Sequence, residues 1–141
     1  MALILVEKTV VLFMKFLESK DDSVLEAILH SMDDMLFISL DLEFLPLTMY
    51  TKKVLAKVLA YKNELVDGIE ELTEAVELAE ELGMHKFVDT IKKELKVIEK
   101  LQKKELDETT FEKIRDSYLE EGLAFLKETF WLVSASEYQR E

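Results

Sequence analysis

Residues 64–104 read ELVDGIEELTEAVELAEELGMHKFVDTIKKELKVIEKLQKK. As far as Glu81 this stretch carries eight acidic residues and no basic one, whereas Lys86 to Lys104 carries seven lysines. On both sides of Gly83 the apolar residues recur every three or four positions, the spacing that lines up along one face of a helix. Glycine at this point favours a helix end. The stretch therefore predicts two antiparallel helices that turn at Gly83 and have complementary charged flanks.

The composition of the whole chain is typical of a packed helical protein. Of its 141 residues 49% are hydrophobic, and 3 Gly and 1 Pro are too few turn residues for a many-stranded protein. Side-chain amides are scarce while lysine and glutamate are plentiful, a bias typical of thermophiles. We predict one all-α domain over residues 1–141, an up-and-down helical bundle of four main helices plus one shorter helical segment after Pro46.

The first segment, residues 2–17, predicts an unusually apolar helix. Its charged side chains, Glu7, Lys8 and Lys15, lie in one narrow sector, so the apolar residues cover well over half of the circumference. Such a helix must be central in the bundle or lie at an interface. The segment is too short and too charged to span a bilayer, and no small-residue cleavage pattern follows it. We expect a cytoplasmic chain without a membrane partner.

Two breaks between helices are expected in the middle of the chain. Residues 38–47 alternate strictly between apolar and polar and include Pro46, so we predict an extended or irregular connection there. Near residues 61–63, Lys62 falls where the apolar stripe of the next helix should continue, and Asn63 is a good helix cap. We therefore predict a kink or break at that point.

The last helix has two adjacent apolar faces and must pack against two sets of neighbours. Gly122 lies within its pattern and costs about 1 kcal/mol of helix propensity relative to alanine. We therefore expect another helix to approach closely at this glycine. The aromatic and apolar cluster near its end includes Phe130, Trp131 and Val133. This cluster is either part of the core or an anchor at a dimer interface, where tryptophan is favoured.

Two carboxylate–histidine pairs are the only candidates for a metal site: Glu26 with His30, and Glu81 with His85. Each pair is spaced by four residues, so its members share one helix face. Di-iron bundles of the ferritin type instead place a histidine three residues after a glutamate. The alternative is that both histidines are solvated or cap a helix. No cofactor is predicted.

The charge distribution argues against two further binding roles. A formal net charge of −12 at pH 7 opposes a polyanionic partner, so no nucleic acid is expected. The available basic patches are residues 86–104 and the lysines Lys52, Lys53 and Lys57, with no aromatic run interleaved for base stacking. The acidic run at 64–81 lacks the glycine-containing loop of most calcium sites and reads as a solvated or lysine-paired face.

Catalytic signatures are missing from the sequence. It has no cysteine, no serine in a glycine-flanked elbow and no phosphate-binding glycine loop, so an enzyme is disfavoured. Residues 75–83 resemble the end of a helix in tetratricopeptide-type repeats, but the 34-residue period of that family does not recur, and no peptide-binding role is carried across.

The expected function follows from the apolar surface. The first and last helices offer more apolar area than four helices easily hide. We therefore expect a self-associating protein-interaction module, a homodimer, with a different protein partner also open. The alternative is a helical bundle that binds a small ligand or a metal ion between its helices.

Overall fold

The structure, a computed structural model, describes residues 2–104 and 108–140. Over these residues the chain is helical and contains no strand, which confirms the predicted all-α class. Its six α-helices are α1 (Ala2–Ser19), α2 (Asp22–Asp41), α3 (Leu45–Tyr61), α4 (Leu65–Glu81), α5 (His85–Gln102) and α6 (Glu108–Arg140). Within the same residues, no helix is both long enough and apolar enough to cross a membrane.

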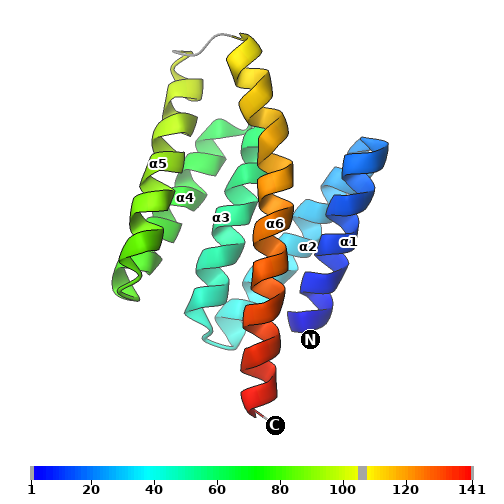
Figure 1. Cartoon of the computed structure of the whole chain (residues 1–141), viewed down its shortest axis with the longest axis vertical. Helices are drawn as coiled ribbons and strands as arrows, with labels where there is room; N and C mark the ends of the chain where they lie inside the picture. The colour runs from blue at the N-terminus through cyan, green and yellow to red at the C-terminus, as the bar shows by residue number, and fades with distance from the viewer. Residues whose placement is uncertain (1, 105–107, 141) are drawn as a thin grey trace.

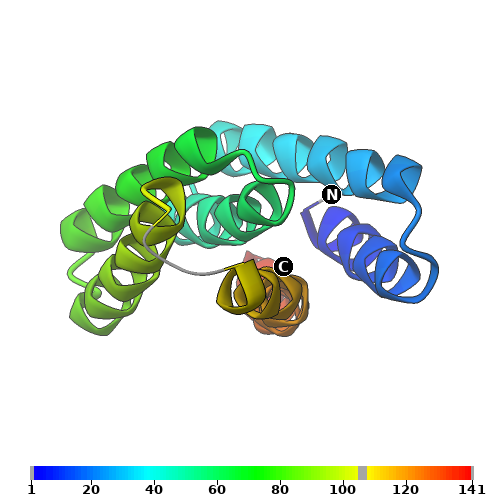
Figure 2. The same ribbon diagram turned by 90° about the horizontal axis from the view of Figure 1, so that it is seen from above.

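The helices form a curved array of two layers with a long helix laid along one side (Figure 1). Seen from above, α2 and α4 form the outer layer and α1, α3 and α5 the inner one, while α6 lies against the inner layer (Figure 2). The main contacts of α6 are with α1 and α3. The expected count of four main helices plus one short segment is wrong, because the segment after Pro46 forms α3, which has 17 residues like α4.

One type of turn joins α2 to α3, α3 to α4 and α4 to α5. Its key residue has a positive φ: 52° at Glu43, 65° at Asn63 and 70° at Gly83. The next residue then donates its N–H to a carbonyl five positions earlier, as from Phe44 to Ser39 at 2.9 Å, which defines the Schellman motif. The three turns recur at positions 43, 63 and 83. The predicted helix end at Gly83 is confirmed, and this regular spacing sets the antiparallel packing of neighbouring helices.

The predicted irregular connection over residues 38–47 is wrong. Helix α2 continues to Asp41, and Pro46 lies in the first turn of α3, where a missing N–H costs nothing. The polar Ser39 is fully buried and its hydroxyl lies 2.8 Å from that of Thr48, whereas Leu40 is exposed. The alternation of apolar and polar residues therefore does not mark the two faces of a strand. Its polar member Ser39 lies on the buried side of α2, because its hydroxyl has a partner in Thr48.

The predicted break near residues 61–63 is confirmed, but Asn63 has a different role from the expected one. It ends α3 in the left-handed conformation, and the cap residue of α4 is Glu64, whose side chain makes no capping hydrogen bond. Asparagine tolerates positive φ better than most residues, so the same side chain that makes a good N-cap also suits a helix C-terminus.

Helix α3 is shared by two apolar clusters. The first joins α1, α2, α3 and α6, and the second joins α3, α4, α5 and Tyr118 of α6. The close approach predicted at Gly122 is confirmed, because a Cβ atom there would lie 3.3 Å from the Phe13 ring and 3.6 Å from the Val54 side chain. Glycine thus lets α6 lie directly against α1 and α3.

Candidate functional site

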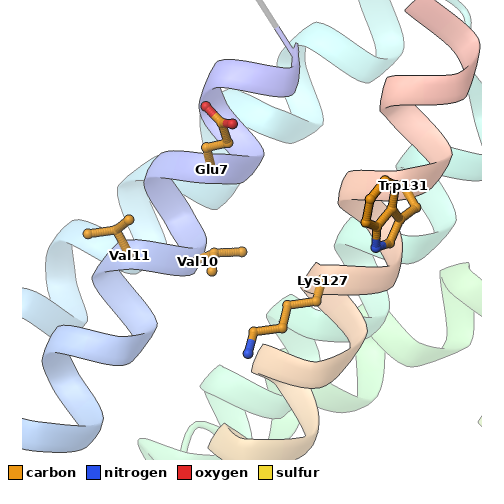
Figure 3. A pocket seen from close by; sticks show the side chains of 5 residues that line it. All are labelled: Glu7, Val10, Val11, Lys127 and Trp131. Carbon is orange, nitrogen blue, oxygen red and sulfur yellow. The ribbon is translucent and has the colours of Figure 1, made fainter.

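A groove of about 450 Å³ runs between α1 and α6. Val10 and Val11 line it from α1, Lys127 and Trp131 line it from α6, and Glu7 lies at its edge on α1 (Figure 3). In that view the Lys127 side chain extends from α6 toward α1, while Trp131 lies on the surface of α6. The groove therefore combines an apolar lining with one acidic and one basic side chain.

The sequence of α1 explains why this surface is apolar. Val6, Phe13 and Phe16 are buried against the other helices. The opposite, exposed side of α1 mixes apolar and charged residues: Ile4, Val11 and Met14 are 67%, 61% and 53% exposed, and they alternate with exposed charged side chains such as Glu7 and Lys8. Because α1 is the last helix of the inner layer, no further helix of the described chain covers this side. The helix predicted to be central or interfacial thus lies at the edge of the array.

The three residues predicted as interface anchors have different outcomes. Trp131 is 71% exposed and lines the groove, so it is not part of the core. Phe130 and Val133 belong to the helical backbone of α6, but their side chains lie outside the described residues. Single exposed apolar side chains are ordinary on protein surfaces, whereas contiguous exposed apolar patches are typical of interaction sites.

The four metal candidates lie in two separate places. Glu26 and His30 are on α2, where Glu26 pairs with Lys62 and the His30 side chain is 79% exposed and lies 4.0 Å from Asp34. Glu81 and His85 flank the turn between α4 and α5, and both are exposed. Among the described residues, no three acidic or histidine side chains come together in a way that could hold a metal ion.

The acidic run pairs mainly with the helix before it. Lys52 of α3 forms ion pairs with Glu71, at 3.1 Å, and with Glu74 of α4. Across the turn at Gly83, Lys92 lies 3.6 Å from Glu80, and both side chains are more than half exposed. The complementary flanks around Gly83 thus meet through an exposed pair, which contributes little to stability, typically below about 1 kcal/mol.

Sequence analysis missed a buried charged cluster where α3 meets α5 and α6. Lys53 and Lys57 of α3 are only 6% and 4% exposed. Their Nζ atoms lie 3.5 Å and 3.3 Å from the same oxygen, Oε1 of Glu94 on α5. Lys57 also donates a hydrogen bond to Glu121 of α6 at 2.7 Å. Two buried ammonium groups therefore share one carboxylate oxygen, with a second carboxylate nearby.

Aromatic rings complete the surroundings of these lysines. Lys53 Nζ lies 4.3 Å from the centroid of the Phe125 ring, and Lys57 Nζ lies 5.0 Å from that of Tyr118. Such contacts stabilise a cation through the electron-rich face of the ring. Burial lowers the pKa of Lys53; Glu94 opposes this shift, and the positive charge of Lys57 adds to it.

Two polar atoms beside this cluster have no hydrogen-bond partner among the described residues: the Tyr118 hydroxyl and Oε2 of Glu94. Leaving a buried polar atom unpaired costs about 1–3 kcal/mol. Burial raises the pKa of Tyr118 above its ordinary value, and the negative charges of Glu94 and Glu121 raise it further. Tyr118 therefore keeps its proton and is able to donate a hydrogen bond.

The sequence did contain a signal for this cluster. Met49, Lys53, Ala56 and Ala60 recur at three- and four-residue spacing, and all are buried on one face of α3. Grouped by charge alone, these lysines read as a basic patch. A lysine in register with small and apolar residues on a helix is a candidate for burial against a carboxylate, and the pattern alone does not name the carboxylate.

Comparison with known proteins yields no assignment: no family model matches the chain, and no curated protein or solved structure matches it significantly.

Proposed function

We propose that the protein is a self-associating interaction module that forms a homodimer through the α1–α6 groove. The observation that carries the proposal is the apolar lining of the groove, where Val10 and Val11 of α1 accompany Trp131, which is 71% exposed. Tryptophan is enriched among the residues that dominate binding energy at protein interfaces. Burying its ring and the neighbouring face of α1 would remove a large apolar area from water, the main favourable term in association.

The charges at the groove support a second copy of the chain as the occupant. In a twofold dimer the same surface meets itself, so each contact from one residue to another occurs twice. Glu7 on α1 and Lys127 on α6 lie on opposite sides of the groove. An antiparallel approach of two copies sets Glu7 of each subunit against Lys127 of the other, which gives two ion pairs at the rim of one apolar contact.

Trp131→Glu tests this proposal. We expect wild-type protein to sediment as a dimer at micromolar concentration and Trp131→Glu to sediment as a monomer, because the aromatic anchor is lost and a carboxylate is desolvated in an apolar contact. Because Trp131 is 71% exposed, we expect the substitution to leave the fold of the monomer intact. Circular dichroism checks this. The measurement is sedimentation equilibrium, supported by native mass spectrometry.

Phe37→Glu is the matched control. Phe37 on α2 is 73% exposed and is an aromatic residue outside the groove, so its replacement by glutamate introduces the same charge elsewhere. We expect this variant to remain dimeric. A dimer that survives Trp131→Glu but dissociates in Phe37→Glu would move the interface to α2 and refute the groove proposal, as would a wild-type monomer.

A further inference from the structure

Helix α6 differs from the other five helices in length and in position. Helices α1 to α5 have 17 to 20 residues each and alternate between the inner and outer layers. This alternation would place α6 in the outer layer, but α6 has 33 residues, lies against the inner layer and extends past the array at its C-terminal end (Figure 1, Figure 2). It packs mainly against α1 and α3 rather than against α5, the helix that precedes it. The inner layer thus has a face of its own, on which α6 is seated.

One stripe of α6 makes this contact. Its buried residues recur every three or four positions, as in an amphipathic helix that binds a groove through one face: Leu119, Gly122, Leu126 and Thr129. At Gly122 the helices are so close that a Cβ atom would lie 3.3 Å from the Phe13 ring. The inner face therefore suits a helix that has an apolar stripe and a glycine at the point of closest approach.

The inner face also carries two buried lysines, against which α6 places an aromatic ring and a carboxylate. The Phe125 ring lies 4.3 Å from Lys53 Nζ, and Glu121 accepts a hydrogen bond from Lys57 at 2.7 Å. Lysine is almost never fully buried unless it is paired. Among the described residues of the array, Glu94 is shared by both ammonium groups, which leaves one positive charge for Glu121 to balance. The face therefore favours an acidic helix.

The fit of α6 to this face is imperfect. The Tyr118 hydroxyl on α6 and Oε2 of Glu94 on α5 are buried and have no hydrogen-bond partner among the described residues. Burying a polar atom without a partner is unfavourable. Both atoms would regain hydrogen bonds to water if α6 left the inner face, and the two lysines would regain their hydration. A helix without a hydroxyl at the position of Tyr118 should therefore bind this face better than α6 does.

We propose that the inner face of α1, α3 and α5 is a binding surface for an acidic amphipathic helix of another protein, and that α6 occupies this surface until such a helix replaces it. A second copy of the chain is a poor competitor, because its α6 fits no better than the one in place. It also competes with a tethered helix whose effective concentration is on the order of millimolar. The inference goes beyond the proposed dimer and does not rest on it.

A fluorescently labelled peptide of residues 108–140 tests the proposal as a stand-in for the partner helix. Fluorescence anisotropy should detect weak binding to the full-length wild-type chain, because the peptide must displace α6. Gly122→Leu in the chain weakens the contact of its own α6, so we expect this variant to bind the wild-type peptide about tenfold more tightly. Ala124→Leu, on the exposed side of α6, is the matched control and should bind the peptide as the wild-type chain does.

The same substitution in the peptide locates the binding surface. A Gly122→Leu peptide meets Phe13 on the inner face, so it should bind the Gly122→Leu chain about tenfold more weakly than the wild-type peptide does. A Tyr118→Phe peptide should bind that chain more tightly than the wild-type peptide, because no unpaired hydroxyl is buried. Circular dichroism establishes that each chain is folded.

Glu121→Lys provides the same reciprocal test if the Gly122→Leu chain does not fold. It sets a further cation beside Lys57, on a side chain that is 55% exposed. The proposal is overturned if the folded variant binds the wild-type peptide no better than the wild-type chain does. It is also overturned if the substituted peptide binds that variant as tightly as the wild-type peptide, or if the Tyr118→Phe peptide binds less tightly.

Sedimentation of mixed chains distinguishes another protein from a second copy as the occupant. Wild-type and Gly122→Leu chains that both carry Trp131→Glu should remain separate, since the α1–α6 contact is removed and neither α6 outcompetes the other's tethered helix. A mixed dimer of these chains would make a second copy the occupant of the inner face and refute the choice of a different protein.

Discussion

At the residue scale, hydroxyl groups account for several interior contacts that join one helix to another. The Thr9 and Ser31 hydroxyls, both fully buried, lie 2.6 Å apart and connect α1 to α2. Thr9 also donates to the carbonyl of Leu5 at 2.7 Å. Buried polar groups that find partners in this way cost little and make the packing of two helices specific. Tyr118 lacks such a partner among the described residues, which makes it the exception in the core.

Tyr118→Phe should change how stability depends on pH. The folded chain holds the Tyr118 proton because burial and the neighbouring carboxylates raise its pKa, while the unfolded chain releases it near the ordinary value of about 10. Above that pH the unfolded state binds fewer protons than the folded state, so wild-type stability falls as pH rises. Tyr118→Phe has no group that ionises at this position, so it does not lose stability in this way.

Urea unfolding at neutral pH and above pH 10 measures the difference. We expect Tyr118→Phe to be at least as stable as wild type at neutral pH, because an unpaired hydroxyl is removed, and its advantage to grow above about pH 10. A constant difference between the two proteins across this range would show that Tyr118 ionises equally in the folded and unfolded states.

At the element scale, the helices are defined by turns whose key residue is not always glycine. Glu43 and Asn63 adopt the same left-handed conformation as Gly83. Non-glycine residues pay about 1–2 kcal/mol for it. Glu43 and Asn63 hold the left-handed conformation because the hydrogen bonds of the Schellman motif satisfy the last carbonyls of each helix. A rule that looks for glycine finds one of these three turns.

Gly122→Leu should loosen the contact of α6 with α1 and α3. A side chain at this position meets Phe13 at 3.3 Å from its first carbon, so a leucine forces the two helices apart. We expect a loss of about 1–3 kcal/mol in the free energy of unfolding, the usual cost of overpacking. Urea denaturation monitored by circular dichroism provides the value.

Ala124→Leu is the control for this prediction. Ala124 lies on the exposed side of α6, so the same added side chain meets solvent and the change stays within about 0.5 kcal/mol. Equal effects at the two positions would contradict close packing at Gly122, because helix propensity by itself favours leucine over glycine.

At the scale of the whole molecule, net charge opposes the proposed dimer. Each subunit has a formal net charge of −12, and two such subunits repel one another over distances comparable to the Debye length. The two rim pairs between Glu7 and Lys127 act in the opposite direction, but they involve few charges. Repulsion between the subunits therefore dominates the dependence on salt.

Raising ionic strength should strengthen dimerisation. Between about 0.01 M and about 0.15 M salt the Debye length falls from about 30 Å to about 8 Å, which screens the repulsion. We expect the dissociation constant from sedimentation equilibrium to fall over this range and Trp131→Glu to remain monomeric throughout. Weaker dimerisation at higher salt would instead indicate that opposite charges across the interface outweigh the net charge.

The local sequence pattern alone determined several features of the fold. The all-helical class, the helix end at Gly83, the break at residues 61–63 and the close approach at Gly122 all follow from periodicity, composition and the steric properties of single residues. The first three features depend on interactions within a few positions of the chain, and a glycine inside a helical pattern indicates a close approach without naming the neighbour.

Tertiary structure decided the features whose partners are distant in the chain. Ser39 continues a helix because Thr48 pairs with its hydroxyl, and Lys53 is buried because Glu94 and an aromatic ring receive its charge. The exposed face of α1 depends on its place at the edge of the array. Burial of a polar group is favourable only when a partner is supplied from elsewhere in the fold, and that partner is not encoded in the neighbouring sequence.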